Sequence, residues 1–480
     1  MVGIEAVRPV PPRSPADGTL REARYGKGIG KRHLEADVDR EADSDEEMEM
    51  EMEEAKEEEE QSHGNNKQGP VTESLVELNL TSASIDKEGM LPPIHSTRPK
   101  NNNDQDVQTG RVDKNSKGCE PTTDIQAISN GLCGLKNMGN TCYMNSCLQC
   151  LSHVAPFIDF FLQNRHVSQV NRNISPSKGE LVDAYANLVQ NMWRIKEFSC
   201  IKPGKLKKSI GAASSFFQGY QQHDAQEFLR FFLDGLHEDL NRIPQKVPYE
   251  EIKDVDGETV EETAHRWWKH YEERNDSHIK DTFSGQLFSA TECKKCGNQS
   301  HAFDPILDIS VPIPSTSNLE KKQVDLRDCL QELTKKEQLD GDNKSYCGKC
   351  KEHQPSTRTL RVYRAPPVLV VHLKRFSQNG MHRSKLSTRV NLPTNEDLDI
   401  ADFCHKPNTE MRYELVGMVN HMGTMTGGHY TANAKNARTG LWYNFNDETV
   451  SKVDPNNFDT STAYMLFFKK KEQEQKKSNL

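Results

Sequence analysis

The aromatic residues of this 480-residue chain are distributed so unevenly that only part of it can bury a hydrophobic core. Of its 34 Trp, Tyr and Phe residues, one, Tyr25, lies within residues 1–130. A segment with so few large apolar side chains cannot offset the ordering entropy of its backbone, about 1–2 kcal/mol per residue. We therefore expect a disordered N-terminal tail over 1–130, a folded domain over 131–470 and a short polar C-terminal tail over 471–480.

Acidic residues are concentrated within this tail. The run from Glu35 to Glu60 holds 16 acidic residues and two basic ones, so it carries a net charge of −14, whereas the whole chain carries −9. Blocks of like charge repel one another, stay solvated and often act as interaction tails. The run is therefore interpreted either as a solvated spacer or as a binding segment for a basic partner such as a histone tail.

Targeting and membrane signals are missing from the sequence pattern. The first 15 residues lack the apolar core of a secretory signal, no stretch reaches about 18 apolar residues, and neither end carries a lipidation motif. We expect a cytoplasmic protein, a nuclear protein or both, with no membrane partner and no direct nucleic-acid partner. Since thiols stay reduced in those compartments, the 12 cysteines suggest metal binding, catalysis or packing rather than disulfides.

The order of the apolar patterns predicts an α+β domain. Apolar residues recur at helical spacing in Asn145 to Gln163, Leu181 to Met192 and Asp224 to Leu240. Short alternating or apolar runs then predict strands at Phe303–Pro314, Arg361–Phe376, Tyr413–Asn420, His429–Ala434, Leu441–Phe445 and Ala463–Lys469. Since helices come first and strands later, we expect an antiparallel sheet. The charged segment Pro244 to Asn275 is interpreted as a helical excursion in which Trp267 and Trp268 pack.

Cys142 stands where a turn rich in Gly and Asn meets the start of a helical pattern. The dipole at a helix N-terminus favours the thiolate, and such sites lower a cysteine pKa below its free value of about 8.5. Asn137, in the same turn, is placed to offer its amide to a developing oxyanion. The pattern fits a nucleophile, but it also fits a capped helix with a buried structural cysteine.

His429 lies in a second Gly-rich segment, Thr426 to Tyr430, that leaves an imidazole accessible. Histidine changes charge near neutral pH and therefore suits general-base chemistry, although a lone histidine is more often structural. Asn446 and Asp447 follow on the next predicted strand, and either can orient the ring. A Cys, then a His, then an Asn or Asp is the arrangement that cysteine proteases use.

Four cysteines form two Cys-x-x-Cys pairs: Cys293 with Cys296, and Cys347 with Cys350. Four thiolates suit tetrahedral Zn²⁺, and Gly297 and Gly348 are expected to allow the tight turns. A closed four-cysteine site has no open position for water, so we expect one structural zinc and not a catalytic one. Two unrelated loops with surface thiols are the alternative. Cys147 and Cys150 lie inside a helical pattern and are interpreted as packing residues.

Two acidic residues, Asp224 and Glu227, open the helical pattern that follows Gln221-Gln222-His223. Carboxylates in a first turn interact favourably with the helix dipole, which is a purely structural explanation. They also fit the wall of a cleft that binds a basic peptide.

Together these segments resemble the ubiquitin-specific protease family of papain-like cysteine peptidases. The family's cysteine, glutamine–aspartate and histidine boxes match Gly134 to Gln149, Gln221 to Phe228, and Gly427 to Tyr430 followed by Trp442 to Val450. The strand Leu369 to Phe376 and the two cysteine pairs also match. The resemblance covers about residues 131–470 in the family's order, and it looks closest to compact members without large insertions.

The resemblance implies a papain-like fold compared to an open hand. A helical thumb would start at Cys142, a β-rich palm would carry His429, and zinc-tipped antiparallel β fingers would span about Phe283 to Arg364. Ubiquitin's tail would lie between thumb and palm, and Asp224 and Glu227 would meet its basic residues.

The implied activity is hydrolysis of the isopeptide or peptide bond after ubiquitin's C-terminal glycine, with ubiquitin and ubiquitinated proteins as partners. Cys142 would be the nucleophile and His429 its base. Asn446 would be the third triad member, with the adjacent Asp447 sharing that task, and Asn137 would help to stabilise the oxyanion.

Three alternatives share parts of this pattern: a catalytically inactive ubiquitin-binding scaffold, a protease for a ubiquitin-like modifier, and a zinc-dependent hydrolase. The presence of Cys142, His429 and Asn446 argues against the scaffold. The all-cysteine metal set argues against the zinc hydrolase, and the acidic Asp224 and Glu227 favour a tail that contains arginines.

Overall fold

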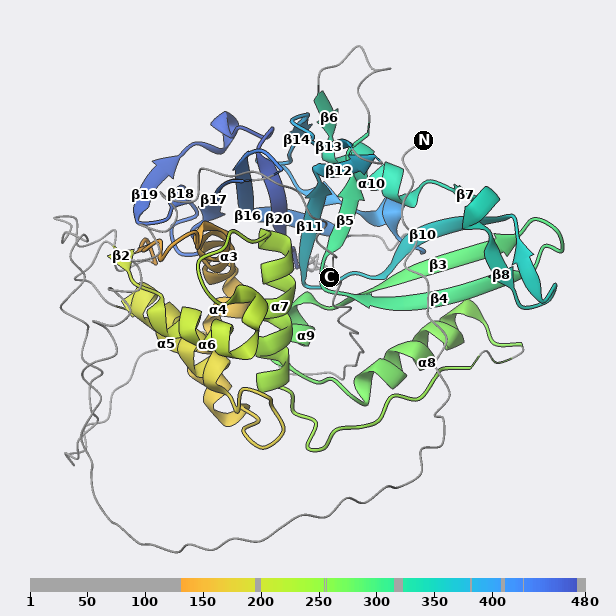
Figure 1. The fold of residues 1–480 in the computed structure, drawn as a ribbon, viewed down its shortest axis with the longest axis horizontal. Coiled ribbons are helices and arrows are strands. Elements are labelled where there is room, and N and C mark those ends of the chain that lie inside the picture. The colour runs from red at the N-terminus through yellow and green to blue at the C-terminus, as the bar shows by residue number, and fades with distance from the viewer. Residues whose placement is uncertain are drawn as a thin grey trace, which may run out of the picture. The chain divides into compact units, whose positions relative to one another are not determined.

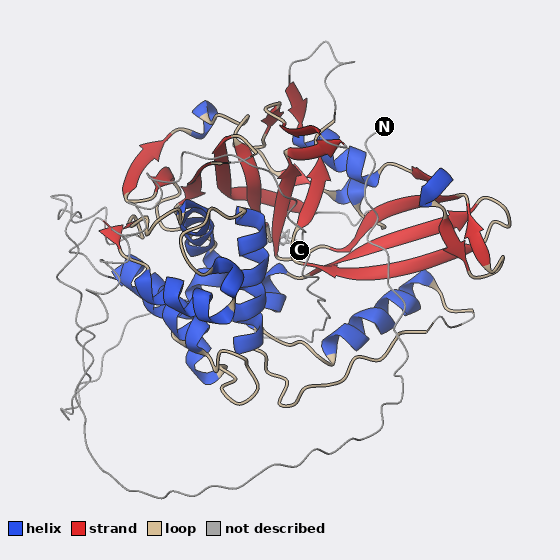
Figure 2. Cartoon of the chain, in the orientation of Figure 1, coloured by secondary structure: helices blue, strands red, loops and turns tan. Residues whose placement is uncertain are grey.

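The computed structural model describes residues 131–194, 200–253, 255, 257–314, 323–379, 382–406, 411–425 and 427–472. The predicted tail over 1–130, its acidic run and most of the C-terminal tail lie outside these residues. Figures 1 and 2 show a group of helices beside a central sheet and a narrower sheet that extends away from it, as expected for an α+β fold. No helix in the described part of the chain is long and apolar enough to cross a membrane.

The helical part, or thumb, contains α3 (Cys142–Ser152), α4 (Ala155–Leu162), α5 (Glu180–Arg194), α6 (Gly204–Ala213), α7 (Ala225–Asp239) and α9 (His278–Phe283). Every residue of α3 is buried, because the helix packs between α7 and the sheet strands β16 and β17. The predicted helix Asn145 to Gln163 is two helices, because Pro156 lacks the backbone N–H that a continuous helix needs and instead occupies the first turn of α4.

The central sheet, or palm, has the strand order β19 (Thr449–Val453), β18 (Trp442–Asn446), β17 (Gly428–Lys435), β16 (Arg412–Gly423), β20 (Ala463–Lys470), β11 (Val368–Lys374) and β5 (Ile309–Pro312). A short strand, β15 (Leu398–Asp399), pairs with β16. The predicted antiparallel pairing is correct except between β5 and β11, which are parallel because a long crossover through the fingers separates them.

The first four residues of β11, Val368 to Val371, are all apolar because both faces of the strand are buried there. Val368 and Val370 pack in the core shared with the thumb helices. Leu369 and Val371 pack in a second core, which includes Leu330 of α10 (Leu326–Thr334). The palm is therefore covered on both sides, with the thumb on the face that α3 contacts.

The fingers are an antiparallel sheet in the order β4 (Gln299–Ile306), β3 (Gly285–Cys293), β10 (Ser356–Arg364) and β7 (Glu337–Leu339), with a hairpin of β8 (Ser345–Cys347) and β9 (Glu352–Gln354). Helix α8 (Val260–Glu272) packs on β4, and its Ala264 joins Phe288 of β3 and Phe303 of β4 in a small apolar cluster, so the excursion predicted over Pro244 to Asn275 is helical in its second half. Trp268 is buried against Tyr271, and the Arg364 guanidinium lies 4.5 Å from its ring centroid, so this tryptophan packs as predicted.

Short strand pairs complete the fold: β1 (Gly134–Leu135) with β2 (Cys200–Ile201), β6 (Gln323–Asp325) with β14 (Arg389–Asn391), and β12 (Phe376–Asn379) with β13 (His382–Lys385). The Asp308 side chain ties the base of the fingers to α7. Its carboxylate accepts a hydrogen bond from Gln226 Nε2 at 3.0 Å and pairs with Arg230 Nε at 2.9 Å.

Arg375 is a fully buried arginine that joins three segments of the palm. Its guanidinium donates to the backbone carbonyls of Leu386 and Thr388, both at 2.9 Å, of Thr460 at 2.8 Å, and of Ala463. Burial lowers the pKa of Arg375 to about 10, so the side chain stays charged at neutral pH. Carbonyl oxygens therefore satisfy this buried cation.

We predict that Arg375→Met lowers the free energy of unfolding by about 3 kcal/mol or more, because several buried carbonyls lose their donor. The matched control is Arg389→Met, whose side chain is 60% exposed and pairs with Asp459 at 3.4 Å. The control should lose less than about 1 kcal/mol. Urea unfolding followed by circular dichroism measures both variants, and equal losses would contradict the assignment.

Candidate active site and metal centre

Cys142 begins α3 directly after a tight turn, as predicted. The turn needs left-handed backbone at Gly139 (φ 91°) and Asn140 (φ 54°), which glycine and asparagine tolerate best. Cys142 is buried, with 5% of its surface exposed.

The pKa of the Cys142 thiol is raised in this structure, so the prediction of a lowered pKa is wrong for the free chain. Burial is the main cause, and the nearby Asp447 carboxylate raises the pKa further. Backbone N–H groups of Tyr430, Tyr143 and Cys142 itself lower it by a smaller amount. Desolvation therefore outweighs the favourable end of the helix dipole.

His429 lies near the start of β17, opposite Met422 of β16 and before the stretch of β17 that pairs with β18. Its Nε2 is 2.7 Å from Oδ1 of Asn446, the last residue of β18. Because an amide oxygen accepts only, Nε2 carries the proton and Nδ1 keeps its lone pair. The structure therefore assigns Nδ1 as the nitrogen that can accept a proton.

Asp447 follows Asn446 in the turn between β18 and β19, with a left-handed backbone (φ 46°). Its Oδ2 lies 4.0 Å from His429 Nε2, too far for a hydrogen bond, and accepts one from Asn137 Nδ2 at 2.9 Å. Its Oδ1 accepts from Asn145 Nδ2 of α3 at 2.8 Å. Asp447 thus joins the palm to the loop and helix that carry Cys142, while Asn446 contacts the imidazole.

Asn137 is held tightly in the loop before Cys142. Its Oδ1 accepts the backbone N–H groups of Gly139 and Thr141, both at 3.1 Å, and one of its two amide N–H donors serves Asp447. The side chain is therefore ordered before any substrate arrives.

Only glycine fits at position 428, beside His429. A Cβ atom there would lie 2.3 Å from both His421 Nε2 and the Met422 carbonyl of the neighbouring strand β16. The Gly-rich segment thus reflects the close approach of β16 and β17 as well as access to the imidazole. Thr426 lies outside the described residues.

Asp224 and Glu227 occupy different positions at the start of α7. Asp224 is the N-cap residue, and its Oδ1 accepts the N–H groups of Gln226 at 2.7 Å and Glu227 at 3.1 Å. Its Oδ2 accepts the hydroxyl of Tyr464 at 2.5 Å. Glu227 is exposed in the first turn of the helix, and its pKa is raised by partial desolvation and by Asp224.

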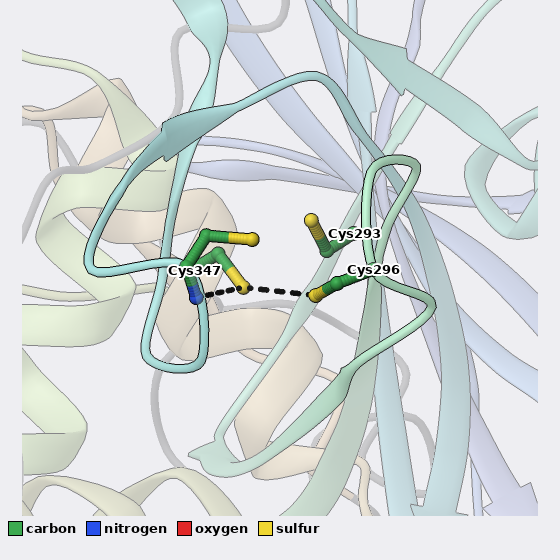
Figure 3. Close-up of side chains that lie close together, drawn as sticks. Cys293, Cys296 and Cys347 are labelled. Carbon is green, nitrogen blue, oxygen red and sulfur yellow. Dashed lines mark hydrogen bonds between the residues drawn. The ribbon is translucent and has the colours of Figure 1, made fainter.

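The four paired cysteines come together at the tip of the fingers, where Cys293 ends β3 and Cys347 ends β8. All four Sγ atoms lie within 4.8 Å of one another, and those of Cys296 and Cys347 are 3.6 Å apart. Figure 3 shows the labelled cysteines approaching from two facing loops. Zn–S bonds of about 2.3 Å in a tetrahedron place sulfur atoms about 3.8 Å apart, so the donor set fits a zinc ion.

The two cysteine turns have the same backbone hydrogen bond but different residues at the critical position. Gly297 (φ 67°) donates its N–H to the Cys293 carbonyl, and Lys351 (φ 57°) donates to the Cys347 carbonyl, both at 2.8 Å. The expectation that Gly348 serves the second turn is wrong, because Lys351 takes the left-handed conformation there.

The remaining described cysteines are mostly packing residues. Cys147 and Cys150 are fully buried in α3 and belong to no metal-binding cluster among the described residues. Cys200 of β2 is also buried.

The comparisons with known proteins agree with this geometry. The sequence model of the ubiquitin carboxyl-terminal hydrolase family matches residues 133–468. Human ubiquitin carboxyl-terminal hydrolase 2 is 39% identical over 359 residues, which cover 75% of this chain and 57% of that protein. The chicken protein of the same name is 40% identical over 348 residues, which cover 72% of this chain and 96% of that protein. This chain thus spans little more than half the length of its human relative.

A solved structure shares the fold. The SAGA deubiquitinase module of Ubp8, Sgf11, Sus1 and Sgf73 bound to monoubiquitin contains a chain with a TM-score of 0.56 and 28% sequence identity. The match covers 75% of this chain and 73% of that chain. From the family match, the close relatives and the shared fold, the chain belongs to the ubiquitin carboxyl-terminal hydrolase family.

Proposed function

We propose that the chain is a cysteine-type deubiquitinase that hydrolyses the isopeptide or peptide bond after ubiquitin's C-terminal glycine on protein conjugates. The observation that carries the proposal is the His429–Asn446 hydrogen bond of 2.7 Å on strands packed against the helix that begins at Cys142. Family membership supports it, as does the likeness to a module that was solved with monoubiquitin bound.

The mechanism starts from a protonated thiol, because burial raises the pKa of Cys142. In the proposed mechanism His429 Nδ1 takes the thiol proton as the sulfur attacks the glycine carbonyl, and Asn446 fixes the ring through its hydrogen bond to Nε2. Asn137 and backbone N–H groups stabilise the oxyanion, where one lost donor typically costs about 10²–10³ in rate. His429 then gives its proton to the departing lysine amine, and water hydrolyses the thioester.

The substrate is recognised in part by charge. Glu227 is exposed at the start of α7, and in the proposed function it contacts the basic residues of ubiquitin's tail. Ubiquitin and ubiquitinated proteins are the proposed partners, with a basic partner proposed for the acidic run of residues 35–60. The cytoplasmic or nuclear location stays a prediction from the sequence.

The cysteine cluster in the fingers is proposed to hold one structural zinc ion. Cys293, Cys296, Cys347 and Cys350 would supply all four ligands, so the ion would link the β3 turn to the β8–β9 hairpin without an open position for catalysis. Because metal-binding free energy contributes to folding free energy, the ion would stabilise the fingers.

The alternative function is a scaffold that binds ubiquitin without cleaving it. The same fold supports both, and the discriminating measurement is turnover. A fluorogenic C-terminal amide of ubiquitin is incubated with the native chain and with Cys142→Ala. We expect release of the fluorophore by the native chain and a loss of at least about 10³-fold in the variant, because the nucleophile is removed. Binding of ubiquitin without turnover by either protein would favour the scaffold.

We predict that Cys293→Ser loses the bound zinc and lowers the melting temperature of the full chain. Metal content by atomic absorption and thermal unfolding measure the two effects. The control is Cys147→Ala, which alters a Cys-x-x-Cys pair inside α3 and should retain the metal. A Cys293→Ser protein with unchanged metal content and melting temperature would rule out the four-cysteine assignment.

The catalytic unit is proposed to be residues 131–470. Deletion of residues 1–125 should therefore change kcat/KM for the ubiquitin amide by less than about threefold, because all the proposed active-site residues remain. Steady-state kinetics of the full and shortened chains test this. A large loss of kcat would assign the deleted segment a part in catalysis.

A further inference from the structure

The end of β16 that lies opposite His429 extends beyond the strand on its outer edge, the edge that faces away from β17. β16 pairs with β17 as far as Gly423, and Met422 lies opposite His429. On the outer edge, β16 pairs with β20 only as far as Asn420. Within the described residues, no strand pairs with the outer edge of the last three residues of β16. The backbone carbonyls there need a donor from elsewhere.

Lys385, the last residue of β13, supplies that donor. Its Nζ donates to the His421 carbonyl at 2.7 Å and to the Gly423 carbonyl at 3.2 Å. Because an ammonium has three N–H donors, one lysine can serve both carbonyls. Lys385 is half-buried and His421 is 3% exposed, so water has little access to replace the first of these bonds. The lysine thus takes the place that a neighbouring strand occupies along the rest of β16.

The lysine projects from a well-anchored part of the palm. Lys385 pairs with Phe376 across the β12–β13 hairpin, and the Phe376 ring lies 5.3 Å from the His421 ring, centroid to centroid. The next residue, Leu386, donates its N–H to the Arg375 carbonyl at 2.7 Å and accepts from the Arg375 guanidinium at 2.9 Å. Since Arg375 is fully buried, the base of the hairpin is fixed to the core of the palm.

Strand β16 supports β17 at the position of His429. The pairing of β17 with β18 begins at Ala432, three residues after His429, whereas the pairing with β16 includes His429 itself. At Gly428 the two strands approach so closely that an added Cβ would lie 2.3 Å from the Met422 carbonyl. A displacement of this end of β16 would therefore carry His429 with it.

The hydrogen bond that orients the imidazole depends on this position. His429 Nε2 lies 2.7 Å from Oδ1 of Asn446, the last residue of β18. A shift of the start of β17 against β18 would lengthen that bond and release the ring. Displacements of about 1 Å in a catalytic group can cost about 10²-fold in rate.

We propose that Lys385 is a positioning residue for the hydrolase: by holding the outer edge of β16, it keeps His429 at hydrogen-bonding distance from Asn446. This role deepens the proposed function and rests on it, because His429 is the proposed base. It also has a consequence that needs no turnover, since the end of β16 should loosen when the N–H donors of Lys385 are removed.

The test compares three variants of the full chain. Lys385→Met keeps the aliphatic stem and removes the N–H donors, whereas Lys385→Arg keeps donors that can serve two carbonyls. The control is Lys435→Met, which removes a half-buried lysine at the opposite end of β17, where Nζ pairs with Glu414 Oε1 at 2.6 Å.

The first measurement is hydrogen–deuterium exchange of the backbone amides, followed by mass spectrometry of fragments that contain residues 421–430. For Lys385→Met we expect exchange in these fragments to become at least about tenfold faster, because the unpaired edge opens locally. Lys385→Arg and Lys435→Met should exchange there at the native rate. Native exchange in Lys385→Met would overturn the proposal.

The second measurement is kcat and KM for the fluorogenic ubiquitin amide. For Lys385→Met we expect kcat to fall about 10- to 100-fold with KM changed less than about threefold, and Lys385→Arg should recover most of that loss. Lys435→Met should match the native chain. A raised KM with native kcat in Lys385→Met would instead make Lys385 a substrate contact and overturn the positioning role.

A double-mutant cycle separates positioning of His429 from a general loss of structure. If Lys385 acts through the bond between His429 and Asn446, Lys385→Met should cost less than about threefold in kcat once Asn446→Ala has removed that bond. Equal losses in the native and Asn446→Ala backgrounds would contradict the proposal.

Exchange and turnover also distinguish this role from the proposed function. A native chain that binds ubiquitin without cleaving it would count against the proposed function, and the exchange rates would then confirm or overturn the hold of Lys385 on β16. If Lys385→Met does not fold, Lys385→Gln takes its place, because its side chain is too short to reach both carbonyls.

Discussion

The Asp447 carboxylate is the interaction on which the site geometry depends. It accepts hydrogen bonds from Asn137 and Asn145, which lie 310 and 302 residues away in the sequence. One anion thus joins the loop before the nucleophile, the helix that begins with it, and the strand turn that presents Asn446. The left-handed backbone of Asp447 directs this side chain back toward the thumb, while the preceding Asn446 contacts the imidazole. Loss of these two hydrogen bonds would separate the thumb half of the site from the palm half without removing a reacting group.

Burial of α3 affects both the fold and the reactivity of the Cys142 thiol. Helix α3 is buried along its whole length, which fixes the position of Cys142 but also raises the pKa of its thiol. A thiol that stays protonated at rest is a weak nucleophile and reacts slowly with oxidants or stray electrophiles. Activation then depends on a correctly placed imidazole. This dependence explains why so many contacts, from Asn446 on one side to Lys385 and β16 on the other, converge on His429 and its neighbours.

The sequence predicted the elements whose patterns are local and long. Helices α5 and α7, the strands β16, β17 and β20, and the cysteine cluster were all expected within a few residues of where they lie. What the sequence did not reveal are features set by tertiary contact. The raised pKa of Cys142 reflects burial by distant strands, and the hydroxyl hydrogen bonds that the Asp224 carboxylate accepts come from two tyrosines that follow it by more than 200 residues. Arg375 belonged to a matched motif, but its clamp on four carbonyls required the folded palm.

The two Cys-x-x-Cys turns in the fingers both need one residue with a left-handed backbone, but one turn places a glycine there and the other a lysine. Gly297 enters the left-handed region without penalty, whereas Lys351 does so at a cost of about 1–2 kcal/mol. The backbone of the Cys293–Cys296 turn therefore forms without steric strain, whereas the contacts around the Cys347–Cys350 turn must offset the cost at Lys351. If the proposed zinc ion is bound, its bonds to Cys347 and Cys350 would offset that cost, so the second turn would gain more from the ion than the first. Removal of the ion would then strain the β8–β9 hairpin more than the end of β3.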